Sequence, residues 1–150
     1  MMYSVMKKTR ENKELTQKEL SEIIGVSRST YAGWENGIDT IPLSKLNELC
    51  NFLDISLDYM CGISNTKQYS NIIKRKINSI LIGKKLKLIR LKNRHTQAKT
   101  AKLIHTNQSN YSRYELGKNT ISTSLIMDFS KYYKVSIDYL CGKKKDSEII

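Results

Sequence analysis

The feature of this sequence that most limits its possible folds is an internal repeat with a period of 80 residues. Residues 3–62 align without a gap on residues 83–142, and chance would supply only a few identities between them. The chain is therefore two copies of one unit of about 60 residues, a size near the lower limit for independent folding. The identities include Lys7/Lys87, Arg10/Arg90, Thr16/Thr96, Gln17/Gln97, Tyr31/Tyr111, Glu35/Glu115, Gly37/Gly117, Asp58/Asp138, Cys61/Cys141 and Gly62/Gly142.

Each unit predicts a set of short helices, because almost no stretch alternates between polar and apolar residues. In the first unit Thr16 and Glu19 form the T-x-x-E pattern of an N-terminal capping box, and Gly25 tolerates the positive φ that ends a helix. Ser27 then caps a second helix, which stops at Asn36-Gly37. Two short helices joined by a turn of about three to four residues are typical of a helix-turn-helix.

Hydropathy and the order of residues at the N-terminus exclude two other classes of protein. No apolar run approaches the roughly 18 residues that a membrane span needs, and Ile80-Leu81-Ile82 is followed at once by Gly83-Lys84-Lys85. Residues 1–6 precede Lys7-Lys8, which reverses the basic-then-apolar order of a secretory signal. We therefore expect a cytoplasmic protein that makes no contact with a membrane.

The sequence gives no basis for catalysis, a metal site or a cofactor. Cys50, Cys61 and Cys141 are an odd number without C-x-x-C spacing, which predicts buried apolar residues, with redox sensing as the alternative. His95 and His105 stand without carboxylate or Cys partners and predict ordinary surface residues. Metalloprotease, phosphate-loop and dinucleotide motifs are absent, so we expect no enzyme, no metal and no cofactor.

Two segments carry a resemblance to a known family. TQKELSEIIGVSRSTYAGWENG at residues 16–37 resembles the Cro/C1 (XRE-like) type of helix-turn-helix DNA-binding domain, and TQAKTAKLIHTNQSNYSRYELG at residues 96–117 looks like a second copy. Each copy closes with S-x-D-Y-x-C-G, at residues 56–62 and 136–142, similar to the end of the fifth helix in that family. The resemblance implies an all-α fold of two tandem five-helix domains.

A helix-turn-helix places its second helix in the major groove of double-stranded DNA, where short polar side chains on the first turn meet base edges. Arg28 suits a bidentate contact to guanine, Gln108 suits adenine, and Arg113 suits guanine or phosphate. The other expected DNA-binding positions are Ser27, Ser29, Thr30, Gly33 and Asn36 in the first unit, and Asn107, Ser109, Asn110, Ser112 and Lys118 in the second.

The resemblance implies further roles for six residues. Gln17 and Gln97 open the first helix of each motif, where they would sit over phosphate and brace the recognition helix; an ordinary helix start is the alternative. A basic residue on the first helix of each unit would pair with the Glu that ends the recognition helix. These structural ion pairs are Arg10 with Glu35 and Arg90 with Glu115.

Charge is divided unequally between the two units. Residues 1–62 hold 7 basic and 9 acidic side chains, a net charge of −2, whereas residues 63–150 hold 19 and 5, a net charge of +14. Because DNA binding draws much of its free energy from counterion release at phosphates, we expect the second unit to supply most of the electrostatic affinity.

The pattern divides the chain into residues 1–64 as domain one, 65–79 as a linker with an amphipathic helix, 80–143 as domain two, and 144–150 as a tail. The amphipathic helix is predicted over Ile72–Ile80 from its apolar stripe. Lys143-Lys144-Lys145 predicts the start of a mobile tail that adds nonspecific attraction to DNA.

These features predict a sequence-specific regulator of transcription, with a repressor as the main hypothesis, that reads the major groove with two recognition helices. Three alternatives stay open: an activator, a protein in which domain two binds DNA while domain one forms a homodimer, and an antitoxin-like or phage protein-interaction module. No ligand-binding domain is evident in the sequence. Any inducer would act through a protein partner or through a pocket that the sequence does not reveal.

Overall fold

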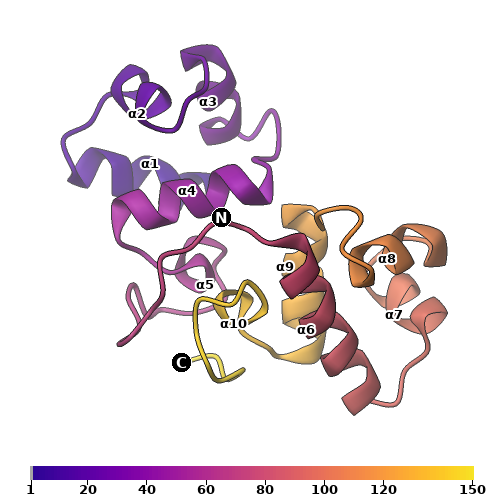
Figure 1. Ribbon diagram of the computed structural model, residues 1–150. Helices are drawn as coiled ribbons and strands as arrows, with labels where there is room; N and C mark the ends of the chain where they lie inside the picture. The colour runs from indigo at the N-terminus through magenta and orange to yellow at the C-terminus, as the bar shows by residue number, and fades with distance from the viewer. Residues whose placement is uncertain (1) are drawn as a thin grey trace.

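The computed structural model describes residues 2–150, apart from the side chain of Tyr3, and this part of the chain is all-helical. Two sets of five helices follow one another, as the repeat predicts, and the all-α fold is confirmed (Figure 1). Domain one holds α1 (Met2–Asn12), α2 (Gln17–Ile23), α3 (Arg28–Glu35), α4 (Leu43–Leu53) and α5 (Leu57–Met60). Domain two holds α6 (Ser79–Lys92), α7 (Gln97–Leu103), α8 (Gln108–Glu115), α9 (Thr123–Tyr133) and α10 (Ile137–Leu140).

The helix ends follow from the capping residues. The side-chain oxygen of Thr16 accepts the N–H of Glu19, whose carboxylate accepts the N–H of Thr16 in return, so the predicted capping box is confirmed. In domain two Thr96 caps α7 alone, because Lys99 stands where the acidic partner would be. The turn after α2 uses Gly25 at φ +74°, and the equivalent turn in domain two puts His105 at φ +68°.

The buried apolar side chains of both domains belong to one hydrophobic core cluster. In domain one Leu20, Tyr31 and Leu46 are fully buried, and in domain two Tyr111 and Ile126 are. Gly83 lies inside α6 where this helix crosses α8, and a Cβ there would overlap the carbonyl oxygens of Tyr114 and Glu115. The close packing of these two helices therefore depends on the missing side chain.

The segment that connects the domains corrects one prediction. The helix predicted over Ile72–Ile80 does not form, because residues 61–78 contain no helix. Ser79 and Ile80 instead begin α6, which the side chain of Asn78 caps. Backbone groups of this segment form hydrogen bonds with the neighbouring domains instead of with one another, as they would in a helix. The carbonyl of Arg75 accepts from the amide nitrogen of Asn47 at 2.7 Å, and the N–H of Ile73 donates to the carbonyl of Lys143 at 2.8 Å.

The C-terminal segment corrects a second prediction, because it packs against the protein instead of forming a mobile basic tail. The N–H of Ser136 donates to the carbonyl of Ser147 at 2.9 Å, just as Ser56 donates to Lys67 at 2.6 Å in domain one. Lys143 is 1% exposed and donates to Oδ1 of Asn47 at 2.8 Å. The sequence alone could not reveal this, since the partner of Lys143 lies 96 residues away.

The two domains meet through equivalent residues, which is the geometry of a two-fold symmetric dimer made within one chain. The short helices α5 and α10 lie side by side at the centre of the molecule (Figure 1). Asp58 of α5 accepts from the N–H of Ile137 at 2.6 Å, and Asp138 of α10 accepts from the N–H groups of Leu57 and Asp58 at 3.0 and 2.9 Å. Each carboxylate thus caps the N-terminus of the other domain's helix.

Three remaining sequence predictions concern cysteines, metals and membranes. Cys50, Cys61 and Cys141 are free and buried, which confirms their packing role, and burial raises the pKa of each thiol. Among residues 2–150 no group of three potential metal ligands comes together. None of the helices described combines the length and the apolar character that a bilayer crossing requires.

Candidate nucleic-acid interface

The first turns of α3 and α8 present the same kind of surface in both domains. Arg28, Ser29 and Thr30 begin α3 and are all exposed; Gln108, Ser109 and Asn110 occupy the equivalent positions of α8 and are exposed as well. Both turns therefore offer three adjacent polar side chains to whatever binds there, with a different residue at the first and third positions.

The residues just before these helices are held by the helices themselves. Oγ of Ser27 accepts the N–H of Thr30 at 3.1 Å, and Oδ1 of Asn107 accepts the N–H of Asn110 at 2.8 Å. Both side chains are exposed but committed to capping. Each is thus fixed in orientation, which makes it suited to positioning a ligand at the helix N-terminus.

The second turns of the two helices differ more. Arg113 is exposed and Ser112, one turn after Gln108, is half-buried. Gly33, the equivalent of Arg113 and one of the expected DNA-binding positions, is buried, whereas the sequence predicted an exposed position. Its carbonyl accepts from the N–H groups of Ile38 and Asp39, so the chain after α3 folds back over it.

Two predicted residues lie beyond the recognition helices. Asn36 is exposed at the C-terminus of α3, where its N–H donates to the carbonyl of Ala32 at 2.9 Å. Lys118 is exposed in the loop after α8, and its N–H donates to the carbonyl of Arg113 at 3.0 Å. Both lie close to the end of a recognition helix and could reach a ligand that extends past it.

A buried ion pair fixes α3 to α1, and the same pair recurs in domain two. Nη2 of Arg10 donates to Oε1 of Glu35 at 2.7 Å and its Nε to Oε2 at 3.0 Å; the bonds from Arg90 to Glu115 measure 2.9 and 2.6 Å. Arg10 with Glu35 and Arg90 with Glu115 are the two ion pairs that the family resemblance implies, and each forms two parallel hydrogen bonds. The third guanidinium nitrogen, Nη1, donates to a backbone carbonyl, that of Leu15 for Arg10 and that of His95 for Arg90.

The first helix of each motif is tied into the same network by its glutamine. Nε2 of Gln17 donates to Glu35 at 3.4 Å, and Nε2 of Gln97 donates to Glu115 at 3.1 Å. Burial alone would raise the pKa of both carboxyls, but the hydrogen bonds from Arg10 and Arg90 hold it below the usual value. Both glutamates therefore stay ionised at neutral pH, and both recognition helices have a fixed orientation.

The family of the chain follows from the comparison with known proteins. The helix-turn-helix family matches twice, at residues 6–60 and at residues 86–140, which together cover more than half of the chain. The chain belongs to the Cro/C1 type of helix-turn-helix proteins, with two tandem domains.

Three relatives from Bacillus subtilis (strain 168) share this helix-turn-helix character. They are "Uncharacterized HTH-type transcriptional regulator YqaE" (35% identical over 49% of this chain), "Uncharacterized HTH-type transcriptional regulator YobD" (35% over 40%) and "HTH-type transcriptional regulator ImmR" (36% over 45%). The matched segments span 64%, 54% and 53% of these relatives. No solved structure matches the chain significantly.

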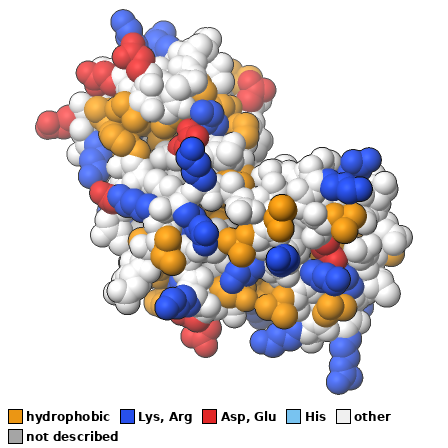
Figure 2. Space-filling model, viewed as in Figure 1, with side chains coloured by type: hydrophobic (Ala, Val, Ile, Leu, Met, Phe, Trp, Pro, Cys, Tyr) orange, Lys and Arg blue, Asp and Glu red, His pale blue; other side chains and the backbone are white. Residues whose placement is uncertain are grey.

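Between the two helix-turn-helix motifs the domains enclose a hollow of about 390 Å³, visible as the notch between the two lobes in Figure 2. Its walls are residues 40–44 of domain one and the equivalent residues 120–124 of domain two. Oγ1 of Thr123 donates to the carbonyl of Ile41 at 2.6 Å across this junction. The pseudo-two-fold relation between the helix-turn-helix units therefore extends from α5 and α10 to the segments that follow both recognition helices.

Lys and Arg side chains spread over domain two, at the lower right of Figure 2, whereas acidic side chains gather on domain one. Lys84, Lys87 and Lys118 are exposed, as electrostatic contacts require. Lys85 is different, because its Nζ lies 4.0 Å from the ring centroid of Tyr139, and burial lowers its pKa. It therefore contributes to packing within domain two.

Asp58 and Asp138 are the residues whose role sequence reasoning missed. As members of S-x-D-Y they suggest helix starts whose carboxylates favour their own helix dipole, yet each bonds the helix of the other domain. Both are fully buried. The one available signal was their identity across the repeat, which does not by itself indicate a contact between domains.

Proposed function

We propose that the chain is a sequence-specific regulator of transcription that binds double-stranded DNA and acts as a repressor by occupying a site near a promoter. The observation that carries this proposal is the pairing of two helix-turn-helix domains through equivalent residues, with the first turn of each recognition helix exposed. A symmetric pair of recognition helices, α3 and α8, suits two half-sites about one helical turn of DNA apart. Here one chain supplies both helix-turn-helix domains, so a second copy of the chain is not needed to form the pair.

Within each domain the polar first turn of the recognition helix would read base edges, while the capped N-terminus and the glutamine of the preceding helix would lie over phosphates. Arg28 would contact guanine in one half-site. Gln108 and Arg113 would contact adenine and guanine in the other, with Arg113 also within reach of phosphate. Because Gly33 has no side chain at the position of Arg113, we propose that the half-sites are unequal and that domain two reads more bases.

The division of charge supports unequal affinities as well. A net charge of +14 over residues 63–150 favours counterion release at the half-site of domain two, whereas domain one, at −2, depends on its fit to base edges. This leaves a second arrangement, in which domain two alone binds DNA and domain one assembles with another copy. The two arrangements predict different binding motifs.

The test is selection from a random duplex library with the complete protein, with Arg28→Ala, and with the double variant Gln108→Ala/Arg113→Ala. Lys145→Ala is the matched control, since it removes a charge from an exposed residue outside both recognition helices. We expect a motif of two unequal parts. Each variant should erase the part that its helix reads, and each lost base contact should cost about 1–3 kcal/mol of binding free energy.

If only the variants in α8 change the motif, domain one does not read DNA and the second arrangement holds. If no sequence is enriched, or if the control variant alters the motif as much as the others do, the proposal of specific DNA binding fails. Repression itself is tested by placing the selected site across a promoter and measuring transcription with and without the protein. A rise in transcription would instead make the chain an activator.

A further inference from the structure

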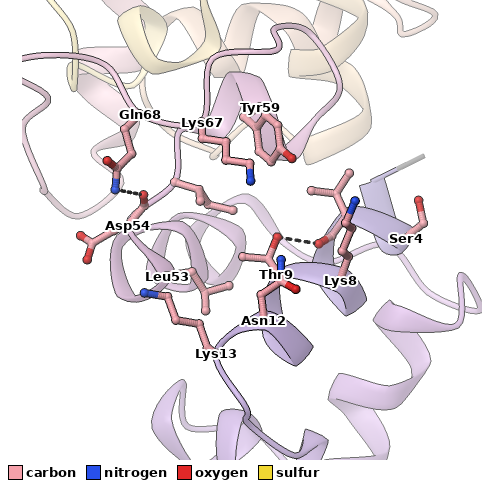
Figure 3. Close-up of a pocket in the computed structure, with 12 residues that line it drawn as sticks. Ser4, Lys8, Thr9, Asn12, Lys13, Leu53, Asp54, Tyr59, Lys67 and Gln68 are labelled. Atoms are coloured by element: carbon pink, nitrogen blue, oxygen red, sulfur yellow. Dashed lines mark hydrogen bonds between the residues drawn. The ribbon is translucent and has the colours of Figure 1, made fainter.

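Domain one contains a pocket of about 510 Å³ that none of the features described so far uses. It opens between α1, the end of α4, α5 and the start of the connecting segment (Figure 3). Its volume falls in the range of pockets that bind small molecules, about 300–1,000 Å³. The recognition helix α3 does not line it, so the pocket is separate from the candidate DNA surface.

The lining combines an apolar interior with cations around it. Val5, Leu53, Ile55 and the ring of Tyr59 supply apolar surface. Three exposed lysines surround that surface: Lys8 from α1, Lys13 just after its end, and Lys67 from the connecting segment. Figure 3 shows Lys67 facing α1 across the open space. Nζ of Lys67 lies 5.8 Å from the ring centroid of Tyr59, so its charge points into the pocket.

The pocket has one acidic lining residue, and that residue already has a partner. A carboxylate oxygen of Asp54 pairs with Lys74, which lies outside the pocket. The pocket therefore carries a net positive charge beside an apolar wall and an aromatic ring. This combination favours a ligand that joins an anionic group to an apolar body.

Domain two differs at the equivalent positions. Lys85 replaces Val5 and lies over Tyr139, the equivalent of Tyr59, at 4.0 Å. Tyr133 replaces Leu53 with a larger side chain. In domain two the cation over the ring therefore comes from the first helix of the domain and lies close to it, whereas in domain one the uncharged Val5 occupies that position and the nearest cation, Lys67, is 5.8 Å from the ring centroid.

We propose that this pocket is a binding site for a small organic anion with an apolar body, whose acidic group is held by Lys8 and Lys67 and whose body lies against Tyr59 and Leu53. The site goes beyond the proposed function, because it does not require DNA. It contacts α1, which carries Arg10, and the connecting segment, which leads to domain two.

The experiment titrates the complete protein with 8-anilinonaphthalene-1-sulfonate, an aromatic anion whose fluorescence rises when it is bound, and with the neutral N-phenyl-1-naphthylamine, which has the same rings without the sulfonate. Amide chemical shifts locate the site. We expect saturable binding of one sulfonate, shifts confined to α1, residues 53–59 and residues 67–68, and weaker binding of the neutral compound.

Three variants test the assignment. Lys67→Gln and Lys8→Gln should each weaken binding of the sulfonate about threefold to tenfold, the effect of losing one exposed charge pair. Val5→Met, which fills the space with a neutral side chain of the reach that Lys85 has in domain two, should weaken both compounds. Lys18→Gln is the control, an exposed lysine outside the pocket, and should change neither.

The proposal is overturned by equal affinity for the two compounds, by shifts centred on another part of the chain, or by binding that Val5→Met leaves unchanged while its melting temperature shows a folded protein. Failure of this test does not bear on DNA binding, which the library selection measures independently.

Discussion

At the scale of single residues, the two copies of the repeat place different residues in the same left-handed backbone conformation. The turn between α2 and α3 uses Gly25 in the left-handed region, and the turn between α7 and α8 uses His105 in the same conformation. For a residue with a Cβ this region costs about 1–2 kcal/mol. The side chain of His105 gains in return only an exposed contact to Asp128 at 3.3 Å.

We therefore predict that His105→Gly raises the free energy of unfolding by about 0.5–1 kcal/mol, because relief of the backbone cost exceeds the added flexibility of glycine in the unfolded chain. Urea denaturation of both proteins measures the difference. Gly25→Ala makes the opposite change at the equivalent position and should lower stability by a similar amount. A lower stability of His105→Gly would mean that the contact to Asp128 outweighs the cost of the turn.

At the scale of helices, the position of the recognition helix depends on two contacts with the first helix of its domain. One is the buried Arg–Glu pair, with bonds of 2.6–3.0 Å in both domains. The other, in domain two, is the crossing of α6 and α8 at Gly83. Neither contact allows much displacement, because an unpaired buried charge and an overlapping side chain are both costly.

Gly83→Ala tests the helix crossing. Alanine favours a helix over glycine by about 1 kcal/mol, yet its methyl group would overlap the carbonyls of α8, so we expect a net loss of about 2 kcal/mol of stability. Thermal and urea unfolding followed by circular dichroism give the value. Lys87→Ala, on the exposed side of the same helix, should stay within about 0.5 kcal/mol of the parent protein. A stabilised Gly83→Ala protein would show that α6 and α8 can separate without cost.

At the scale of the whole molecule, the arrangement of the domains rests on two buried carboxylates. Asp58 also accepts from the hydroxyls of Tyr69 at 2.7 Å and Ser136 at 2.5 Å, so this site joins both domains and the connecting segment. Burial and the nearby charge of Asp58 raise the pKa of Asp138 to about 6. Lys143, buried beside the pair, partly opposes that shift.

The raised pKa predicts how stability depends on pH. Because Asp138 has a higher pKa in the folded chain than in the unfolded chain, the folded chain holds more protons between about pH 4 and 6. Stability should therefore rise as the pH falls from 7 to 5. Glu35 and Glu115, whose pKa is lowered, act in the opposite direction only below about pH 4.5.

Unfolding in urea at a series of pH values, compared with Asp138→Asn, isolates this contribution. The variant lacks the titrating group, so its stability should depend less steeply on pH between 5 and 7. Lys145→Ala, which leaves the interface intact, should keep the slope of the parent protein. Equal slopes for the parent protein and Asp138→Asn would show that Asp138 is ionised throughout this range.

The two domains, the two helices of each motif and the exposed first turns of the recognition helices were predictable from the order of residues alone. Capping residues, turn residues and apolar spacing act within a few residues of one another, so a linear pattern records them directly. The Arg–Glu pairs could be predicted only from the family resemblance, because the two residues of each pair are 25 positions apart in the sequence.

The way the two domains meet was not predictable from the sequence and depends on contacts between residues far apart in the chain. Across the junction of the domains the carboxylates of Asp58 and Asp138 accept from groups 78 to 81 residues away, and such contacts leave no periodicity in the sequence. For the same reason the apolar stripe of residues 72–80 suggested a helix, while the two domains, by accepting and donating its backbone hydrogen bonds, hold the segment before Ser79 in a non-helical conformation. The burial of Lys143 follows from the same long-range packing, because its partner Asn47 lies 96 residues away, whereas Gly33 is covered by the residues that directly follow α3.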